Sequence, residues 1–181
     1  MNLMTPPCNP IRKLRGFTMI ELIVTVSVAA ILAAIAVPSF VAMAQNQRRV
    51  AEVMDLVQAL NNARSEATKQ NSVAGVSVTA NGSWGNGYSV CCTSANASVE
   101  TIAPIDSRST LTADLAGTAP ASVTFASNGA QTQSTGTVVF TFCDRRGSTA
   151  ATAVEVNPLG HIQTGFKAGF RVDQTTALVC P

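Results

Sequence analysis

The chain has 181 residues, enough for one globular domain or for a short appendage followed by one domain. Its formal net charge is +2, but Arg12, Lys13 and Arg15 precede an apolar run and resemble the charged segment of an export signal. Without residues 1–16, nine Lys and Arg remain against ten Asp and Glu, so the side chains sum to −1. The composition therefore does not indicate a globally basic surface for nucleic acid.

An uncharged apolar run covers residues 22–44 and would span about 35 Å as a helix, enough for a hydrocarbon core of about 30 Å. Basic residues precede the run and none follows it directly, which predicts a cytoplasmic N-terminus with the rest of the chain outside. Glu21 is the only charge between Phe17 and Arg48. Pro38 lies inside the run, where it would remove one backbone hydrogen bond and introduce a kink or local unwinding.

The helical pattern continues beyond the apolar run, with polar residues on the other faces and Arg48 and Glu52 spaced as an i,i+4 pair. The residues of its apolar stripe are Val50, Val53, Met54, Val57, Leu60, Ala63 and Ala67. We expect one helix from Phe17 to about Gln70, whose second half packs against a globular domain. A coiled-coil partner is the lesser alternative.

After Asn71 the sequence predicts strands separated by turns, and an α+β fold in which the long helix packs on an antiparallel sheet. The expected strand pairs are 73–79 with 87–94, 122–125 with 137–144, and 152–157 with 161–166. Residues 103–120 are rich in Pro, Ser and Thr, which predicts a long loop or an irregular sheet edge.

Cys8 precedes the apolar run, and an even number of cysteines follows it: Cys91, Cys92, Cys143 and Cys180. After an export signal this favours disulfides over metal, and no C-x₂₋₄-C pair typical of zinc occurs. Three pairings are open. Because a bond within the adjacent pair would be strained, we expect one of those two cysteines to join Cys143 or Cys180.

No catalytic set can be recognised in the chain. His161 is the only histidine, and no Ser-His-Asp or Cys-His arrangement follows from the spacing. The sequences "GNG" and "SNG" are turns that lack the strand–helix context of a phosphate loop. We therefore expect neither an enzyme nor a bound metal or cofactor.

Residues 12–40, "RKLRGFTMIELIVTVSVAAILAAIAVPSF", resemble the type IV pilin signature. The resemblance implies cleavage by a prepilin peptidase after Gly16, N-methylation of Phe17, and contact between Glu21 and the Phe17 amine of a neighbouring subunit. It also implies that Pro38 lets the helix loosen in a filament. The expected regions are a leader (1–16), a transmembrane and assembly helix (17–44), its amphipathic continuation (45–70) and a periplasmic β-rich pilin domain (71–181).

Three further stretches resemble the GspH/FimT family: "LVQALNNARSEATKQNSVAGVSV" (56–78), "FTFCDRRG" (140–147) and "AVEVNPLGHI" (153–162). This resemblance implies a minor pilin of a type IV pilus, in a tip or priming complex, with an H-type minor pseudopilin of type II secretion as the alternative. The implied partners are prepilin peptidase, major and minor pilins, the inner-membrane assembly platform and, before assembly, membrane lipid. The implied location is the inner membrane with a periplasmic C-terminal domain, and then the extracellular pilus.

Some members of this family bind DNA through a C-terminal G-R-x-R motif, and here the matching residues are Gly160-His161-Ile162-Gln163. Both arginines are missing. A weak, salt-sensitive patch could still form from Arg145, Arg146, Lys167 and Arg171. A DNA receptor at the pilus tip is thus a third and less favoured function.

Overall fold

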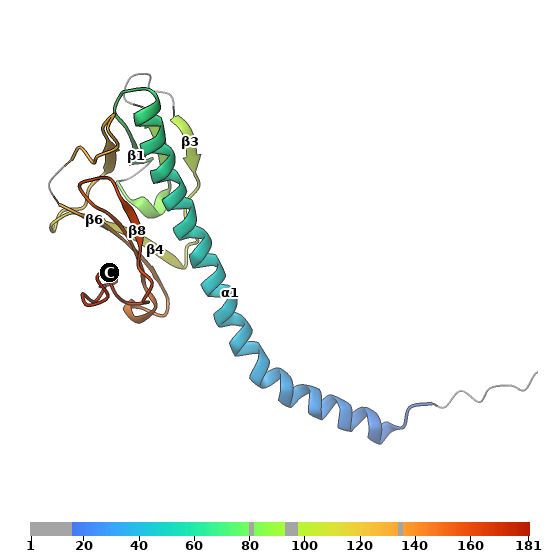
Figure 1. Ribbon diagram of the computed structural model, residues 1–181. Helices are drawn as coiled ribbons and strands as arrows, with labels where there is room; N and C mark the ends of the chain where they lie inside the picture. Colours follow the sequence, from blue (N-terminus) through green and yellow to red (C-terminus); the bar gives the residue numbers. More distant parts are fainter. Residues whose placement is uncertain (1–15, 80–81, 93–97, 134–135) are drawn as a thin grey trace, which may run out of the picture. The chain divides into compact units, whose positions relative to one another are not determined.

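The computed structural model describes residues 16–79, 82–92, 98–133 and 136–181 (Figure 1). The chain divides into two compact units, Met1–Gln45 and Asn46–Pro181. A single helix, α1 (Met19–Lys69), begins in the first unit and ends in the second. Its bounds agree with the helix predicted from Phe17 to about Gln70.

Within the first unit, α1 is long and apolar enough to cross a membrane, judged by length and composition. In its most apolar 18-residue window none of the residues is buried.

The described residues of the second unit form two four-stranded antiparallel sheets, in the strand orders β3-β2-β1-β5 and β4-β6-β7-β8. The first sheet consists of β1 (Ala74–Val78), β2 (Tyr88–Cys92), β3 (Ser98–Ile102) and β5 (Ser122–Phe125). The second consists of β4 (Ser109–Asp114), β6 (Val138–Asp144), β7 (Thr152–Val156) and β8 (Ile162–Thr164). Two 3₁₀ turns, η1 (Trp84–Asn86) and η2 (Ser148–Ala150), lie between strands.

Two of the three predicted strand pairs are confirmed. Val76 lies opposite Val90 in β1 and β2, and Val154 lies opposite Thr164 in β7 and β8. Each of these pairs is a local hairpin, so its turn residues were visible in the sequence.

The third predicted pair is wrong, because β5 pairs with β1 and β6 lies between β4 and β7. All residues of β6 except Asp144 are buried, as expected of a central strand with two neighbours. For residues 103–120 the expected long loop is wrong in part, since the stretch contains β4, whereas the alternative of a sheet edge is confirmed, since β4 is the edge strand of the second sheet. Leu111 and Ala113 are buried there while Thr110 and Thr112 are exposed, which is the alternation of a strand with one buried face. The many Ser and Thr residues of this stretch made that alternation hard to recognise in the sequence.

Residues of α1 and both sheets form one hydrophobic core. The residues that α1 buries are Val53, Leu56, Ala59, Leu60, Ala63 and Ala67. The predicted packing of the helix on a globular domain is therefore confirmed, but the stripe is rotated, because Val50 and Met54 are 49% and 65% exposed. Trp84 packs edge-on against Phe140 with ring centroids 4.8 Å apart.

The disulfide joins Cys143 of β6 to Cys180, with Cα atoms 5.9 Å apart. The expected bond from Cys91 or Cys92 to Cys143 or Cys180 is therefore wrong, because the latter two bond to each other. The Cys91 thiol is free and lies 3.5 Å from the Ser77 hydroxyl. Cys91 belongs to the other sheet, whereas the C-terminal segment returns to η2, where Cys180 N–H donates to Ser148 Oγ at 3.1 Å. The side chain of Cys92 lies outside the described part of the chain.

Candidate assembly site

The predicted processing site lies at the start of α1. Gly16 is exposed, Phe17 is 73% exposed, and the helix begins two residues later at Met19. The Thr18 hydroxyl accepts a hydrogen bond from the Glu21 backbone N–H at 3.3 Å. Thr18 is therefore the N-cap of α1, a role that the Thr-x-x-Glu spacing could have revealed. The Glu21 side chain stands in the first helical turn, where the helix dipole favours an acid.

The first half of α1 presents apolar side chains around the whole helix. Its exposed large apolar residues between Met19 and Met43 are Met19, Ile20, Leu22, Ile23, Val24, Val26, Val28, Ile31, Leu32, Ile35, Val37, Phe40, Val41 and Met43. A helix that is apolar on every side requires lipid or other protein around it.

Two hydroxyl groups in this half are satisfied within the helix. Thr25 Oγ1 donates to the Leu22 carbonyl at 2.9 Å, and Ser27 Oγ donates to the Ile23 carbonyl at 2.8 Å. These bonds reduce the cost of placing the hydroxyls in hydrocarbon.

Pro38 lies inside α1, and the helix continues through it to Lys69. Because proline has no N–H, the carbonyl of Ala34 lacks its usual donor four residues later. The missing bond does not end the helix. Loosening of this segment in a filament stays a prediction.

At the start of the second unit, a polar network connects α1 to the end of β6. Arg49 Nη1 lies 3.4 Å from Asp144 Oδ2 and also donates to the Ala150 carbonyl. Arg146 Nε donates to both Asp144 oxygens at 3.1 and 3.0 Å, and its Nη1 donates to Asn46 Oδ1 at 2.8 Å. Hydrogen bonds from Arg146 hold the pKa of Asp144 below its usual value.

The predicted DNA patch is largely occupied by internal contacts. Arg146 is bound to Asp144, and Arg171 Nε lies 2.9 Å from Glu155 Oε1. Lys167 Nζ lies 3.7 Å from the centroid of the Phe170 ring, while Arg145 is exposed. Two of the four cations are thus neutralised by carboxylates, which weakens them as phosphate ligands.

Glu52 faces the loop before β4 and was not singled out by sequence reasoning beyond its spacing from Arg48. Arg48 pairs with Asp106 at 3.5 Å. Glu52 Oε2 is buried and has no hydrogen-bond partner within the described part of the chain. Burial raises the pKa of the Glu52 carboxyl, and hydrogen bonding to Ser109 and the Asp106 backbone only partly offsets it.

Two stretches that carry the family resemblance meet at Gly129. Arg64 Nε donates to the Gly129 carbonyl at 3.0 Å. Gly160 has a φ of +77°, and a Cβ there would lie 1.9 Å from the same carbonyl oxygen. Only glycine fits this approach, so Arg64 and Gly160 have a structural role here.

His161 lies beside this contact in the β7–β8 turn, is exposed, and donates its backbone N–H to Asn157 Oδ1 at 2.9 Å. Over residues 16–79, 82–92, 98–133 and 136–181 no group of three His, Cys, Asp or Glu side chains could hold a metal ion. Within these ranges the strongest candidate for function is therefore the exposed start of α1.

The family model described as "Type II transport protein GspH" matches residues 52–160, more than half of the chain. The chain belongs to the GspH family. A second model, "Prokaryotic N-terminal methylation motif", matches residues 11–37. Together they place the chain among type IV minor pilins and pseudopilins carrying an N-methylation motif. Membership implies processing by prepilin peptidase and assembly with other pilins.

Among solved structures, the chain is similar to the type IV minor pilin FimU of Pseudomonas aeruginosa strain PAO1. The identity is 22% and the TM-score 0.54, over 66% of this chain and 88% of FimU. A second crystal form of FimU gives 20% identity and a TM-score of 0.49, over 66% and 90%. The first match shows the pilin fold, a long helix on antiparallel sheets. No curated protein sequence matches the chain at a significant level.

Proposed function

We propose that the GspH-family chain is a minor pilin of a type IV pilus, incorporated in the tip or priming complex. The observation that carries this proposal is one helix that begins with an N-methylation motif, exposes an apolar first half and anchors a GspH-family domain with its second half. Cleavage would follow Gly16, and Phe17 would become the N-methylated first residue. Residues 17–44 would form the membrane and assembly segment, 45–70 its amphipathic continuation, and 71–181 the β-rich domain.

In this proposal the processed chain starts in the inner membrane with its C-terminal domain in the periplasm, and then enters the extracellular pilus. Prepilin peptidase, the inner-membrane assembly platform and major and minor pilins would be its successive partners. The apolar, internally hydrogen-bonded first half of α1 supports this route, since it suits both a lipid and a helix-packed environment.

Glu21 would select the neighbouring subunit. A carboxylate in hydrocarbon is unfavourable by ~2.5–3.5 kcal/mol on insertion scales. No residue in the described ranges hydrogen-bonds the Glu21 carboxylate, so it remains available to the Phe17 amine of another subunit. Two such charges attract strongly at low dielectric, and their contact would fix the axial register.

The test of this role is Glu21→Ala, with Ser27→Ala as the control in the same half of α1. We expect Glu21→Ala to be cleaved normally, with Phe17 at the N-terminus by mass spectrometry. Its amount in sheared filaments should fall at least ~10-fold, equivalent to ~1.4 kcal/mol. Ser27→Ala should assemble like the wild type. Normal incorporation of Glu21→Ala into filaments would contradict the proposal that the Glu21 carboxylate selects the neighbouring subunit.

An H-type minor pseudopilin of type II secretion is the second candidate, favoured by the family description itself. The same architecture serves both machines. Deleting the gene separates them: a minor pilin is required for surface filaments, whereas a pseudopilin is required for the release of secreted enzymes. If the deletion strain kept its surface filaments but no longer released secreted enzymes, the pseudopilin function would replace the minor pilin function proposed above.

A DNA receptor at the pilus tip is the third candidate and the least supported. Both arginines of the motif are missing at Gly160–Gln163, and Arg146 and Arg171 are engaged with carboxylates. A gel shift with the processed chain in detergent at two salt concentrations tests it. The absence of a shift at low salt would exclude this function.

A further inference from the structure

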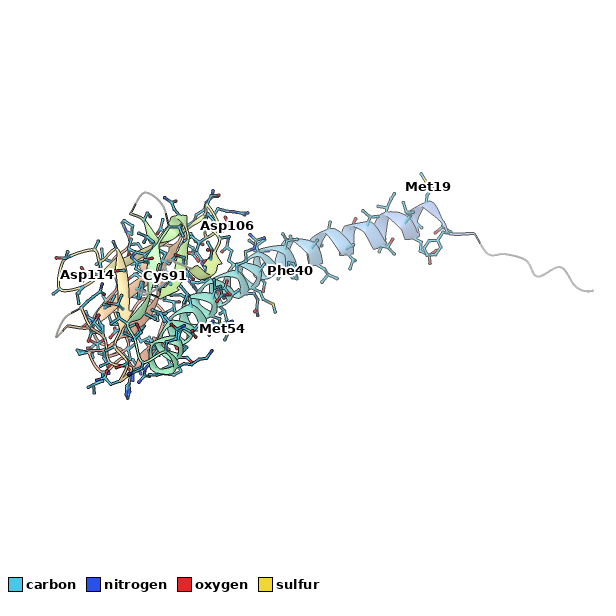
Figure 2. The ribbon with its side chains drawn as sticks, turned by 90° about the horizontal axis from the view of Figure 1, so that it is seen from above. Met19, Phe40, Met54, Cys91, Asp106 and Asp114 are labelled. Carbon is cyan, nitrogen blue, oxygen red and sulfur yellow. A yellow bond between two sulfur atoms is a disulfide. The ribbon has the colours of Figure 1, made fainter. Side chains whose placement is uncertain are left out.

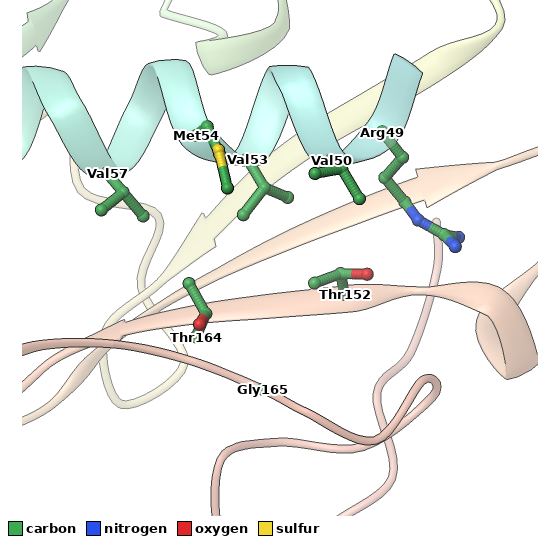
Figure 3. A pocket seen from close by; sticks show the side chains of 8 residues that line it. All are labelled: Arg49, Val50, Val53, Met54, Val57, Thr152, Thr164 and Gly165. Carbon is green, nitrogen blue, oxygen red and sulfur yellow. The ribbon is translucent and has the colours of Figure 1, made fainter. Parts of the chain in front are cut away.

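A groove of about 380 Å³ runs between α1 and the edge of the second sheet (Figure 3). Its helix side consists of Val50, Val53, Met54 and Val57, and its sheet side of Thr152, Thr164 and Gly165, with Arg49 as the one charged residue. The lining is therefore almost uncharged. Every lining residue belongs to the second unit of the chain.

The apolar stripe of α1 is wider than the sheet that covers it. Val53 is 8% exposed, yet its neighbours Val50 and Met54 are 49% and 65% exposed. All three residues line the groove beside β8, where the sheet ends. One more strand beside β8 would place inward side chains against Val50 and Met54.

The free edge of β8 carries unused backbone groups. Gly165 N–H donates to the Ala153 carbonyl at 2.8 Å, and Asn157 N–H donates to the His161 carbonyl at 3.1 Å. Because the bonded pairs of an antiparallel ladder alternate, Ile162 and Thr164 direct their N–H and C=O groups away from β7. In the ranges that the structure describes, no strand pairs with this edge.

Hydrogen bonding and charge together define what can occupy the groove. A helix laid over β8 would bury the Ile162 and Thr164 backbone groups without partners, which is costly, whereas a strand would pair them. A charged segment would find no partner, because Arg49 is already bound to Asp144 and the Ala150 carbonyl. The groove thus complements an uncharged extended segment with an apolar side chain at every second position.

We propose that the edge of β8 and this groove accept such a strand from a neighbouring pilin-family subunit. The added strand would pair with Ile162 and Thr164 and insert one apolar side chain between Met54 and Thr164. Identifying the donor as a neighbouring pilin rests on the proposed function. The requirement for an uncharged strand rests only on the groove.

The test places a photo-crosslinking p-benzoylphenylalanine at position 54 of the full-length chain in cells. Ala51, which is exposed on α1 but does not line the groove, receives the same amino acid as the matched control. We expect position 54 to form an adduct that mass spectrometry maps to a non-helical segment of another pilin. Position 51 should give at least tenfold less of it.

A second variant, Thr164→Pro, removes an outward-facing N–H together with the Thr164 side chain, and it leaves the N–H groups that pair with β7 in place. The adduct from position 54 should fall at least tenfold in Thr164→Pro, whereas Thr164→Ala, which changes the side chain but keeps the N–H, should retain most of it. If Thr164→Pro fails to fold, positions 54 and 51 alone decide the question. Adducts with an α1 helix, with lipid alone, or equally from both positions would overturn the inference, as would the absence of any adduct.

The two proposals fail in distinguishable ways. A chain that is absent from sheared filaments but gives the position-54 adduct in membranes contradicts the pilus function and supports the strand site. A chain that is present in filaments without that adduct contradicts only the strand site.

Discussion

The two halves of α1 have similar apolar side chains but opposite environments. In the first half Leu32 and Ile35 are 62% and 72% exposed, whereas in the second half Leu56 and Leu60 are completely buried. Figure 2 shows the labelled Phe40 and Met54 on this same helix, and both are exposed. The first half is apolar on every side, whereas the second half is amphipathic, with one apolar face and polar residues on the others.

This difference shows that hydrophobicity alone does not assign a helix its role. The second half has strands to pack on, so its apolar residues stabilise the domain. The first half has none among residues 16–45, the described part of its own unit, so its apolar residues are left for lipid or other protein to cover. Matched substitutions in the two halves should therefore affect different measurements.

The largest expected effect is that of Leu60→Ala, compared with Leu32→Ala. Leu60→Ala should lower the free energy of unfolding by ~2–5 kcal/mol, because it leaves a cavity in the core. Leu32→Ala should change it by less than ~0.5 kcal/mol, as expected of an exposed position. Urea unfolding of the full chain in detergent can be followed by the fluorescence of Trp84, which is the only tryptophan and is 3% exposed.

Equal losses from Leu60→Ala and Leu32→Ala would contradict the comparison. So would a loss confined to Leu32→Ala, since that residue would then belong to the folding core.

An intermediate effect is expected from removing the disulfide. Cys143 and Cys180 are 37 residues apart, and opening a loop of this size should lower the free energy of unfolding by ~2–4 kcal/mol. The variant is Cys143→Ser with Cys180→Ser, followed by the same Trp84 signal. Cys91→Ser is the control, because Cys91 is free. If Cys91→Ser destabilised the domain as much, the assigned pairing would be wrong.

The smallest effect is expected from Glu52→Gln, which places a neutral side chain at a site that disfavours charge. A raised pKa in the folded state means that the carboxyl contributes stability below its unfolded pKa and loses it as pH rises through the folded pKa. Glu52→Gln should therefore stabilise the domain by less than ~1 kcal/mol at pH 7. The gain should shrink at pH 4, as the pH falls below the pKa of Glu52 in the unfolded chain and this carboxyl becomes protonated in both the folded and the unfolded wild type.

Asp144 gives the opposite control for that experiment. Its pKa is lowered, so its contribution is present above the unfolded pKa and is lost as pH falls through the folded value. Asp144→Asn should destabilise the domain at pH 7 and lose its effect in acid. A Glu52→Gln gain that persists unchanged at pH 4 would show that charge is not the cause.

The contacts near in sequence were predictable, and the distant ones were not. The hairpin from β7 to β8 followed from its Pro-Leu-Gly turn, and the helix from its periodicity. The pairing of β5 with β1 joins residues 45 to 51 positions apart, as in Val123 opposite Val76, and no local signal specifies it. The same reason explains the disulfide, since Cys180 reaches Cys143 only through the return of the C-terminal segment to η2.

The sequence alone determined the class of this protein, because the N-methylation motif, the acid at position 21 and the apolar helix are local features that need no folded partner. Tertiary structure decided which face of α1 is buried, which cysteines pair and which arginines are neutralised. Those outcomes depend on the order of the strands in the two sheets. Strand order is set by contacts between residues far apart in the sequence, so local patterns do not reveal it. The clearest consequence of this strand order is that Val50 and Met54 remain exposed beside β8, the edge strand of the second sheet.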